Sequence, residues 1–146
     1  MLVERLLPAA RNRLVTIRDD ASLVEAAKLL RPGTDLIVVC DQAGHLAGVI
    51  TKTDVVAQLG QCQEASCAKP ASSVMTRDVV VCHPDDWINE IWSTMKWRRL
   101  KNVPITDPDS RPIGILTARD ALEILLEEVE SEDDMLRDYV MNIGYQ

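Results

Sequence analysis

Short apolar runs alternate along this chain with longer stretches that have helical spacing. The continuous runs 37–40, 48–51, 103–106 and 114–117 are typical of buried strands, and shorter apolar segments at 14–17 and 79–82 predict two more. Two stretches place apolar residues on one helix face, at Leu23, Ala26, Ala27 and Leu30 and again at Ile88, Ile91, Trp92 and Met95. With a helix after each of the runs 48–51 and 114–117, the pattern predicts the element order β-α-β-β-α twice.

The order occurs twice because the sequence itself is repeated. Residues 35–59 align without a gap to residues 101–125, 66 positions later. The identical positions are Asp41, Gly48, Thr51, Asp54 and Leu59, which return as Asp107, Gly114, Thr117, Asp120 and Leu125. The upstream segments 16–30 and 81–95 also correspond, with the first copy one residue shorter near Gly33. The chain is therefore a duplicated unit.

Each copy contains two strands joined by a turn rich in Asp, Gly or Pro, which favours a hairpin covered on one face by helices. A unit of about fifty residues buries little apolar surface alone, so we expect two copies packed as a pseudo-twofold pair. We predict an α+β (α/β-like) fold of two tandem β-α-β-β-α repeats with a C-terminal helical extension. Its expected parts are a first repeat with its N-terminal lead-in (1–62), a linker (63–72), a second repeat (73–130) and a helical tail (131–146).

Charge and composition narrow the range of partners. The net charge is −7, with many acidic residues gathered in 127–134. Nucleic acids and anionic membranes require clustered Lys and Arg, so neither is an expected partner. The first residues carry charges from Glu4 onward and lack a long apolar stretch, so we expect neither a secretory signal nor a membrane span and place the protein in the cytoplasm.

The end of each copy carries the most specific signal. The segments GVITKTD (48–54) and GILTARD (114–120) share a Gly-apolar-apolar-Thr-x-x-Asp pattern, and each follows an apolar strand and an Asp. In this they resemble the cystathionine-β-synthase (CBS) domain family, whose members occur as tandem pairs with this element order. The resemblance extends over residues 1–130 and includes the lead-in VMTRDVVVCHPDD. It implies a regulatory module that binds AMP, ADP, ATP or another adenosyl ligand, such as S-adenosylmethionine or NAD, and requires no cofactor.

The repeated Thr-x-x-Asp is also a good helix start. Thr51 or Thr117 can accept a hydrogen bond from the backbone amide three residues on, while Asp54 or Asp120 reaches back to form a capping box. The same helix N-terminus favours a phosphate, and a carboxylate can accept hydrogen bonds from ribose hydroxyls. By the resemblance, Asp54 and Asp120 hold ribose, and Thr51 and Thr117 lie by ribose or phosphate. The two roles are compatible.

The resemblance also places the purine between apolar strands. It implies contacts from Ile17 and Val38 in one copy and from Cys82 and Pro104 in the other. Ordinary core packing is the alternative for all four residues.

Charges before the central strand distinguish the two copies. The second copy has Arg98, Arg99 and Lys101 there, whereas the first has Thr34 and Asp35. We therefore expect a phosphate to be neutralised mainly by the second copy, with Lys101 as a ligand contact; a solvated edge is the alternative. Asp35 would repel a polyphosphate, which would leave one of the two sites empty or suited to an uncharged ligand.

The sequence holds no familiar catalytic motif. It has no Gly-x-Ser-x-Gly, no Gly-Lys-Ser/Thr loop and no His-Glu-x-x-His, so we expect a sensor, without catalytic or metal-binding residues, rather than an enzyme. The four cysteines form no CxxC pair and are interpreted as core or linker thiols. A thiol- or metal-responsive site at Cys62, Cys67 and Cys82 with His83 is a further alternative.

The C-terminal segment predicts an interaction surface. Apolar positions continue at near-helical spacing through the acidic stretch, at Leu122, Leu125, Val129, Leu136, Val140 and Ile143. A long or broken helix with this stripe needs a surface to cover it, and CBS pairs commonly assemble as homodimers, so we expect a homodimer. The alternative function is a ligand-free interaction dimer that regulates a partner protein.

Overall fold

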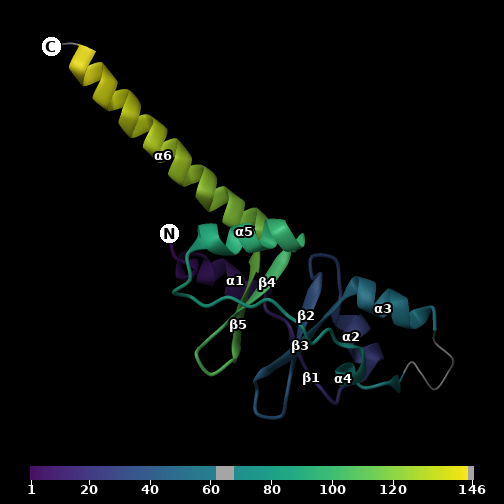
Figure 1. The fold of residues 1–146 in the computed structure, drawn as a ribbon. Helices are drawn as coiled ribbons and strands as arrows, with labels where there is room; N and C mark the ends of the chain where they lie inside the picture. Colours follow the sequence, from purple (N-terminus) through teal and green to yellow (C-terminus); the bar gives the residue numbers. More distant parts are fainter. Residues whose placement is uncertain (62–67, 145–146) are drawn as a thin grey trace.

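The computed structural model describes residues 1–61 and 68–144. Before the first repeat lie η1 (Val3–Leu6) and α1 (Leu7–Arg13). The first repeat consists of β1 (Thr16–Arg18), α2 (Leu23–Leu29), β2 (Leu36–Cys40), β3 (Leu46–Thr51) and α3 (Lys52–Leu59). The second consists of α4 (Ala71–Val74), α5 (Ile88–Arg98), β4 (Asn102–Thr106), β5 (Pro112–Thr117) and α6 (Ala118–Gly144). The predicted α+β pair of repeats with a C-terminal helix is confirmed (Figure 1).

Each repeat is built around an antiparallel hairpin, β2 with β3 and β4 with β5. The two hairpin turns are closed in the same way: Oδ1 of Asp41 or Asp107 accepts two backbone amide hydrogen bonds, each 2.9 Å long. Each turn also contains one residue at positive φ, Gly44 at 84° and Ser110 at 62°. The aspartate recurs in both copies because its side chain holds the turn together.

The first repeat has a third strand that the second lacks. β1 runs parallel to β2, so the first sheet has the order β1-β2-β3, whereas the second contains β4 and β5 alone. The predicted strand over 79–82 is therefore wrong, and this segment makes a single bridge, Cys82 to Ile105. Pro104 explains the loss, because it has no amide, whereas Val38 at the same position of the first repeat donates its amide to the segment leading into β1.

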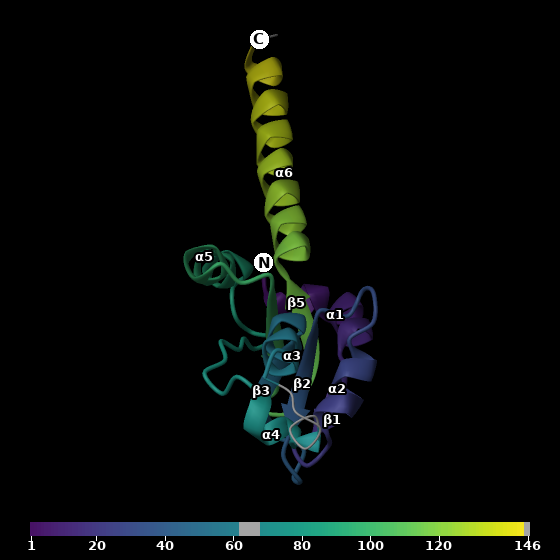
Figure 2. The ribbon, with the colours of Figure 1, turned by 90° about the vertical axis from the view of Figure 1, so that its right-hand side faces the viewer.

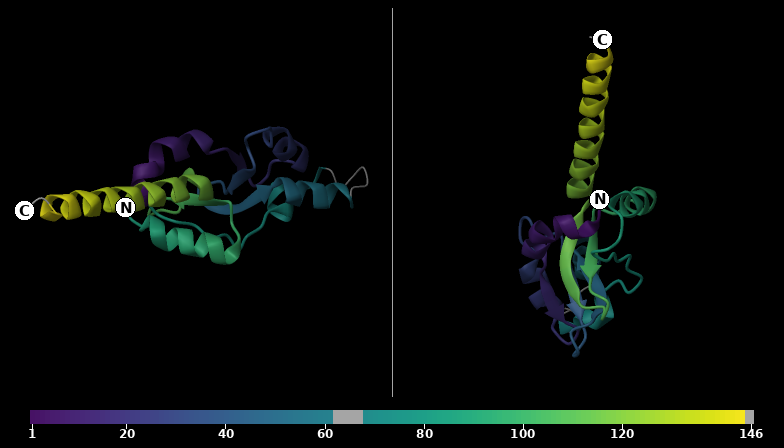
Figure 3. Two further views of the ribbon diagram at one scale, coloured as in Figure 1. Left: turned by 90° about the horizontal axis from the view of Figure 1, so that it is seen from above. Right: turned by 90° about the vertical axis from the view of Figure 1, so that its left-hand side faces the viewer.

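The lead-in of each repeat packs on the other repeat. η1 and α1 contribute Val3 and Ala10 to the core of the second repeat, and α1 lies against β5. The segment before the second repeat contributes Ala71 and Met75 to the core of the first. Figures 2 and 3 show β5 between α1 and α5. The two halves are thus connected by an exchange of their leading segments.

The repeated glycines mark where these lead-ins cross the strands. A Cβ atom on Gly48 would lie 2.7 Å from the carbonyl oxygen of Thr76. A Cβ atom on Gly114 would lie 2.9 Å from the Cβ of Ala10. A side chain has no room at either position, which accounts for glycine in both copies.

A small apolar cluster contains residues of both repeats. Val38 of β2, Val49 of β3 and Ile115 of β5 are buried together, with 0 to 7% of their surfaces exposed. The cluster links the two hairpins through their central positions.

α6 is a continuous helix of 27 residues that extends away from the two repeats (Figures 1 and 2). Its first turns pack on α5 and bury Ala121 and Ile124, and Glu128 pairs with the amino group of Met1 at 3.0 Å. Further along, large apolar side chains are 57 to 70% exposed: Val129, Met135, Leu136, Tyr139, Val140 and Met141. Within residues 1–61 and 68–144, no helix combines the length and apolar character needed to cross a membrane.

Candidate functional site

The first Thr-x-x-Asp motif forms the capping box expected from its sequence. Thr51 Oγ1 accepts a hydrogen bond from the amide of Asp54 at 3.3 Å, and the Thr51 amide donates to Asp54 Oδ2 at 2.9 Å. The Thr51 hydroxyl also lies 3.1 Å from the same carboxylate oxygen. These bonds fix both side chains at the N-terminus of α3, where the helix dipole favours an anion.

This capped helix end opens on a cleft between the two repeats. An inner part of about 210 Å³ is lined by Thr51 and Asp54 of the first repeat and by Leu100 and Pro104 of the second. Val79 and Val80, which lead into the second repeat, line it as well. An outer part of about 480 Å³ also contains Thr51 and Leu100. The cleft therefore has an apolar interior next to a polar mouth, which suits a ligand with a planar base and a polar end.

Basic residues of the second repeat face the first motif across this mouth. Arg99 and Lys101 line the outer cleft together with Thr51. Asp35 also lies there, but its carboxylate is paired with Lys52 Nζ at 3.1 Å. The expected repulsion by Asp35 is therefore opposed by three neighbouring cations.

Arg99 has a strained backbone. Its φ is 56°, in the left-handed region, and Gly33 takes a φ of 90° in the corresponding turn of the first repeat. A non-glycine residue in this region costs about 1 kcal/mol or more. In the second repeat this unfavourable backbone conformation occurs at Arg99, which lines the outer cleft.

The second motif is arranged differently. The Asp120 amide donates to Thr117 Oγ1 at 3.1 Å, as in the first motif. The Asp120 carboxylate, however, pairs with the guanidinium of Arg13 in α1. Among the described residues, no bond runs back from the Thr117 amide to Asp120, so the second capping box is half formed.

The structure brings together some of the predicted ligand contacts and separates others. Thr51, Asp54, Pro104 and Lys101 share the cleft. Val38 and Cys82 are fully buried, and Ile17 packs on the core of the first repeat. Thr117 and Asp120 are half-buried beside α1. Ligand contact stays a prediction for all nine residues.

Several cleft residues were missed from the sequence. Thr76, Asp78, Val79 and Val80 belong to the lead-in of the second repeat, yet they line the cleft beside the first motif. The sequence shows that this segment resembles a family lead-in, but it does not tell which repeat the segment crosses. Arg98 also lines the inner cleft and pairs with Asp78 at 3.6 Å.

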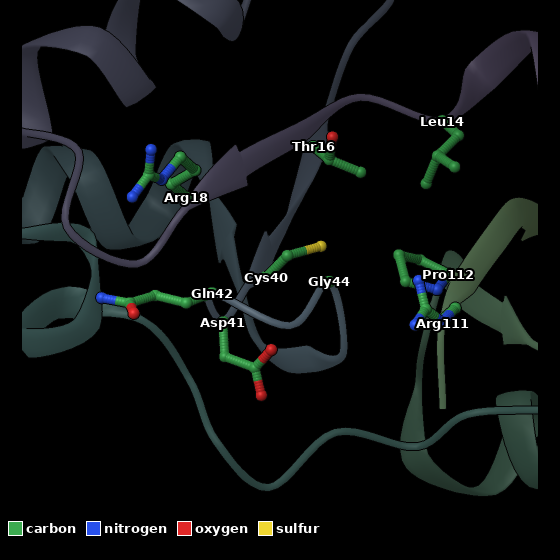
Figure 4. Close-up of a pocket in the computed structure, with 9 residues that line it drawn as sticks. All are labelled: Leu14, Thr16, Arg18, Cys40, Asp41, Gln42, Gly44, Arg111 and Pro112. Atoms are coloured by element: carbon green, nitrogen blue, oxygen red, sulfur yellow. The ribbon is translucent and has the colours of Figure 1, made fainter. Parts of the chain in front are cut away.

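A wider cleft of about 840 Å³ lies at the turn end of the hairpins (Figure 4). Arg18 and Cys40 of the first repeat and Arg111 of the second line it, together with Asp41. It contains none of the predicted ligand residues and no helix N-terminus, so the cleft at Thr51 is the better candidate.

The proposed thiol site is only partly described. Cys62 and Cys67 lie outside the described residues. Burial and, to a lesser extent, the charge of Asp86 raise the pKa of the Cys82 thiol to about 12, so it stays protonated at neutral pH. His83 Nδ1 lies 3.0 Å from the Thr106 carbonyl oxygen. Within residues 1–61 and 68–144, no three His, Cys, Asp or Glu side chains are grouped so that they could hold a metal ion.

Comparison with solved structures places this architecture among known ones. The chain is similar to the CBS domain pair of protein MJ0100 in complex with 5′-methylthioadenosine and S-adenosyl-L-methionine. The TM-score is 0.71 and the sequence identity is 26%, and the match covers 88% of this chain and 98% of that one. It is also similar to the CBS-domain protein ATU1752 from Agrobacterium tumefaciens, with a TM-score of 0.70, 28% identity, and coverage of 84% and 91%.

Sequence comparison finds relatives that are longer than this chain, and it identifies the family to which the chain belongs. The chain is 30% identical over 107 residues to L-aspartate semialdehyde sulfurtransferase of Methanocaldococcus jannaschii, covering 73% of this chain and 20% of that protein. It spans about a fifth of the length of the first curated relatives that it matches. The CBS domain model matches twice, at residues 4–60 and 71–127. The chain therefore belongs to the CBS domain family and carries a tandem pair of its domains.

Proposed function

We propose that this chain is a regulatory module that binds an adenosyl ligand in the cleft between its repeats. The observation that carries the proposal is the capped N-terminus of α3, where Thr51 and Asp54 border an apolar interior and Thr51 shares the polar mouth with Arg99 and Lys101. The adenosyl ligands of the MJ0100 domain pair, which is 26% identical, support this class of ligand. The ligands considered are AMP, ADP, ATP, S-adenosylmethionine, 5′-methylthioadenosine and NAD.

Each part of the cleft has a role in this proposal. The base enters the apolar interior beside Pro104 and Leu100, and the ribose hydroxyls donate to the Asp54 carboxylate. A phosphate or carboxylate at the ligand's other end is neutralised by Arg99 and Lys101 at the mouth. Binding then shifts the population between arrangements of the two repeats, and a partner reads this shift. The module itself performs no reaction and needs no cofactor.

A thermal-shift screen with these ligands tests whether any of them binds. A ligand at a hundredfold excess over its dissociation constant stabilises the folded state by about 2.7 kcal/mol, which raises the melting temperature. Absence of a shift with every ligand would contradict the proposal.

Isothermal titration calorimetry with AMP and 5′-methylthioadenosine tests the assigned residues. We expect Asp54→Asn to weaken both ligands, because both carry a ribose. Arg99→Gly and Lys101→Ala should weaken AMP roughly tenfold, the loss of one charge-assisted hydrogen bond, and leave 5′-methylthioadenosine nearly unchanged. Arg119→Ala is the matched control, since its side chain is 86% exposed on α6. Equal affinity of the Lys101 variant and the control for AMP would exclude the phosphate role.

A second candidate function is a homodimeric interaction module in the cytoplasm. The exposed apolar side chains along α6 favour it, because such a stripe has no partner within the described residues of its own chain. We propose that two copies pair through α6, and that this dimer presents the cleft to a regulated partner protein. The acidic net charge keeps nucleic acids and anionic membranes outside the proposal.

A further inference from the structure

The two repeats differ at the residue that approaches each motif from the exchanged lead-in. At the first motif this residue is Asp78, which lines the cleft with a side chain that is 91% exposed. At the second motif it is Arg13, whose guanidinium contacts the Asp120 carboxylate. The Asp120 side chain is only 15% exposed. A cation thus contacts the carboxylate that the resemblance assigns to ribose.

The contact between Arg13 and Asp120 is shielded from solvent. The two atoms that meet, Arg13 Nη1 and Asp120 Oδ2, are both inaccessible to water, and neither makes a hydrogen bond of good geometry within the described residues. Their interaction is therefore mainly a charge pair. The Asp120 carboxylate, 15% exposed, depends on it more than Arg13, whose side chain is 36% exposed. Removing Arg13 would leave a largely buried carboxylate without its cation.

The helix that carries Arg13 is held close to β5. Ala10 is fully buried against the backbone of Gly114, where even a Cβ atom would lie only 2.9 Å away. This packing of α1 on β5 places Arg13 beside the N-terminus of α6. At the first motif the corresponding residue is Asp78, which carries the same sign of charge as Asp54 and pairs with Arg98 at 3.6 Å.

We infer that Arg13 acts as an internal occupant of the second motif, so that the module binds one adenosyl ligand per chain, at Thr51 and Asp54. The inference rests on the proposed function and adds its stoichiometry. The Asp120 oxygen that contacts Arg13 Nη1 is shielded from solvent, so a ribose hydroxyl can reach this oxygen only if Arg13 moves away. Arg13 is a specificity-determining residue in this arrangement.

Titration calorimetry of the full chain with 5′-methylthioadenosine tests this inference, because this ligand carries no phosphate that could attract Arg13. We expect one site in the wild-type protein, two sites in Arg13→Ala, and one site in the double variant Arg13→Ala/Asp54→Asn. Arg119→Ala removes an exposed arginine next to Asp120 and should retain one site. Thermal unfolding of each variant shows that the protein counted in the titration is folded.

The outcomes separate the two proposals. Two sites in the wild type, or an unchanged single site in a folded Arg13→Ala protein, would overturn the inference and leave the proposed function standing. No binding of 5′-methylthioadenosine to any of these proteins, together with no thermal shift for any of the other ligands, would contradict the proposed function and the inference together. A wild-type site that survives Asp54→Asn would overturn the inference and the assignment of the site to Thr51 and Asp54, and would leave only the class of ligand standing.

Discussion

In the second repeat, the His83 side chain takes the place of a backbone hydrogen-bond donor that the first repeat has. In the first repeat the amide of Asp19 donates to the carbonyl oxygen of Cys40 at 2.9 Å. The corresponding residue of the second repeat is Pro84, which has no amide. His83 Nδ1 lies 3.0 Å from the carbonyl oxygen of Thr106 and 3.2 Å from the Thr106 hydroxyl oxygen. In the tautomer with the proton on Nδ1, the imidazole donates to the carbonyl and supplies the missing donor.

We expect His83→Ala to lower the free energy of unfolding by about 1 kcal/mol, because the carbonyl of the buried Thr106 then loses a donor. Urea denaturation followed by circular dichroism measures the change. His45→Ala is the control, since His45 lies in the turn of the first hairpin and its side chain is 43% exposed. Equal stability of the two variants would contradict this role for His83.

At the scale of elements, the lead-ins cross β3 and β5 with no room for a side chain at Gly48 or Gly114. We expect Gly48→Ala and Gly114→Ala each to destabilise the protein by about 1 to 3 kcal/mol, because the added methyl would overlap Thr76 or Ala10. Thermal or urea unfolding measures the loss. The matched control is Gly60→Ala, where the nearest atom is 3.6 Å away and φ is −65°. An unchanged stability of Gly48→Ala would show that the lead-in moves aside easily.

The elements that could be predicted from the sequence are those held by hydrogen bonds between residues close together in the chain. The Asp41 and Asp107 turns and the capping box at Thr51 each depend on hydrogen bonds within a few residues, so the sequence pattern was sufficient. The strand predicted over 79–82 failed for a reason outside its own segment. Its apolar composition is that of a strand, but the ladder also requires a donor on the neighbouring strand, which Pro104 removes.

The sequence predicted ligand contacts in both repeats. The structure brings Thr51, Asp54 and Lys101 to one cleft, and their function as ligand contacts stays a prediction. The duplicated motif gave no indication that Asp120 would pair with Arg13. That contact depends on the exchange of lead-ins between repeats, and helical spacing alone does not specify which neighbour a helix packs against.

At the scale of the whole molecule, much of α6 extends beyond the two repeats and leaves large apolar side chains exposed. Val129, Leu136 and Val140 lie on one face and are 61 to 65% exposed, while acidic residues occupy much of the remaining surface. Apolar exposure favours pairing of two α6 helices, whereas the like charges oppose it. Salt screens the repulsion and leaves the apolar contact, so the two contributions can be separated experimentally.

Sedimentation velocity at micromolar concentration measures the balance. We expect a homodimer whose dissociation constant falls as the salt concentration rises from about 0.1 M to about 1 M, where the Debye length shortens from about 10 Å to about 3 Å. Leu136→Glu should give a monomer, because it places a charge within the apolar face. Ser131→Glu adds the same charge on the opposite side of the helix and should leave the dimer largely intact. A wild-type monomer at both salt concentrations would exclude pairing through α6.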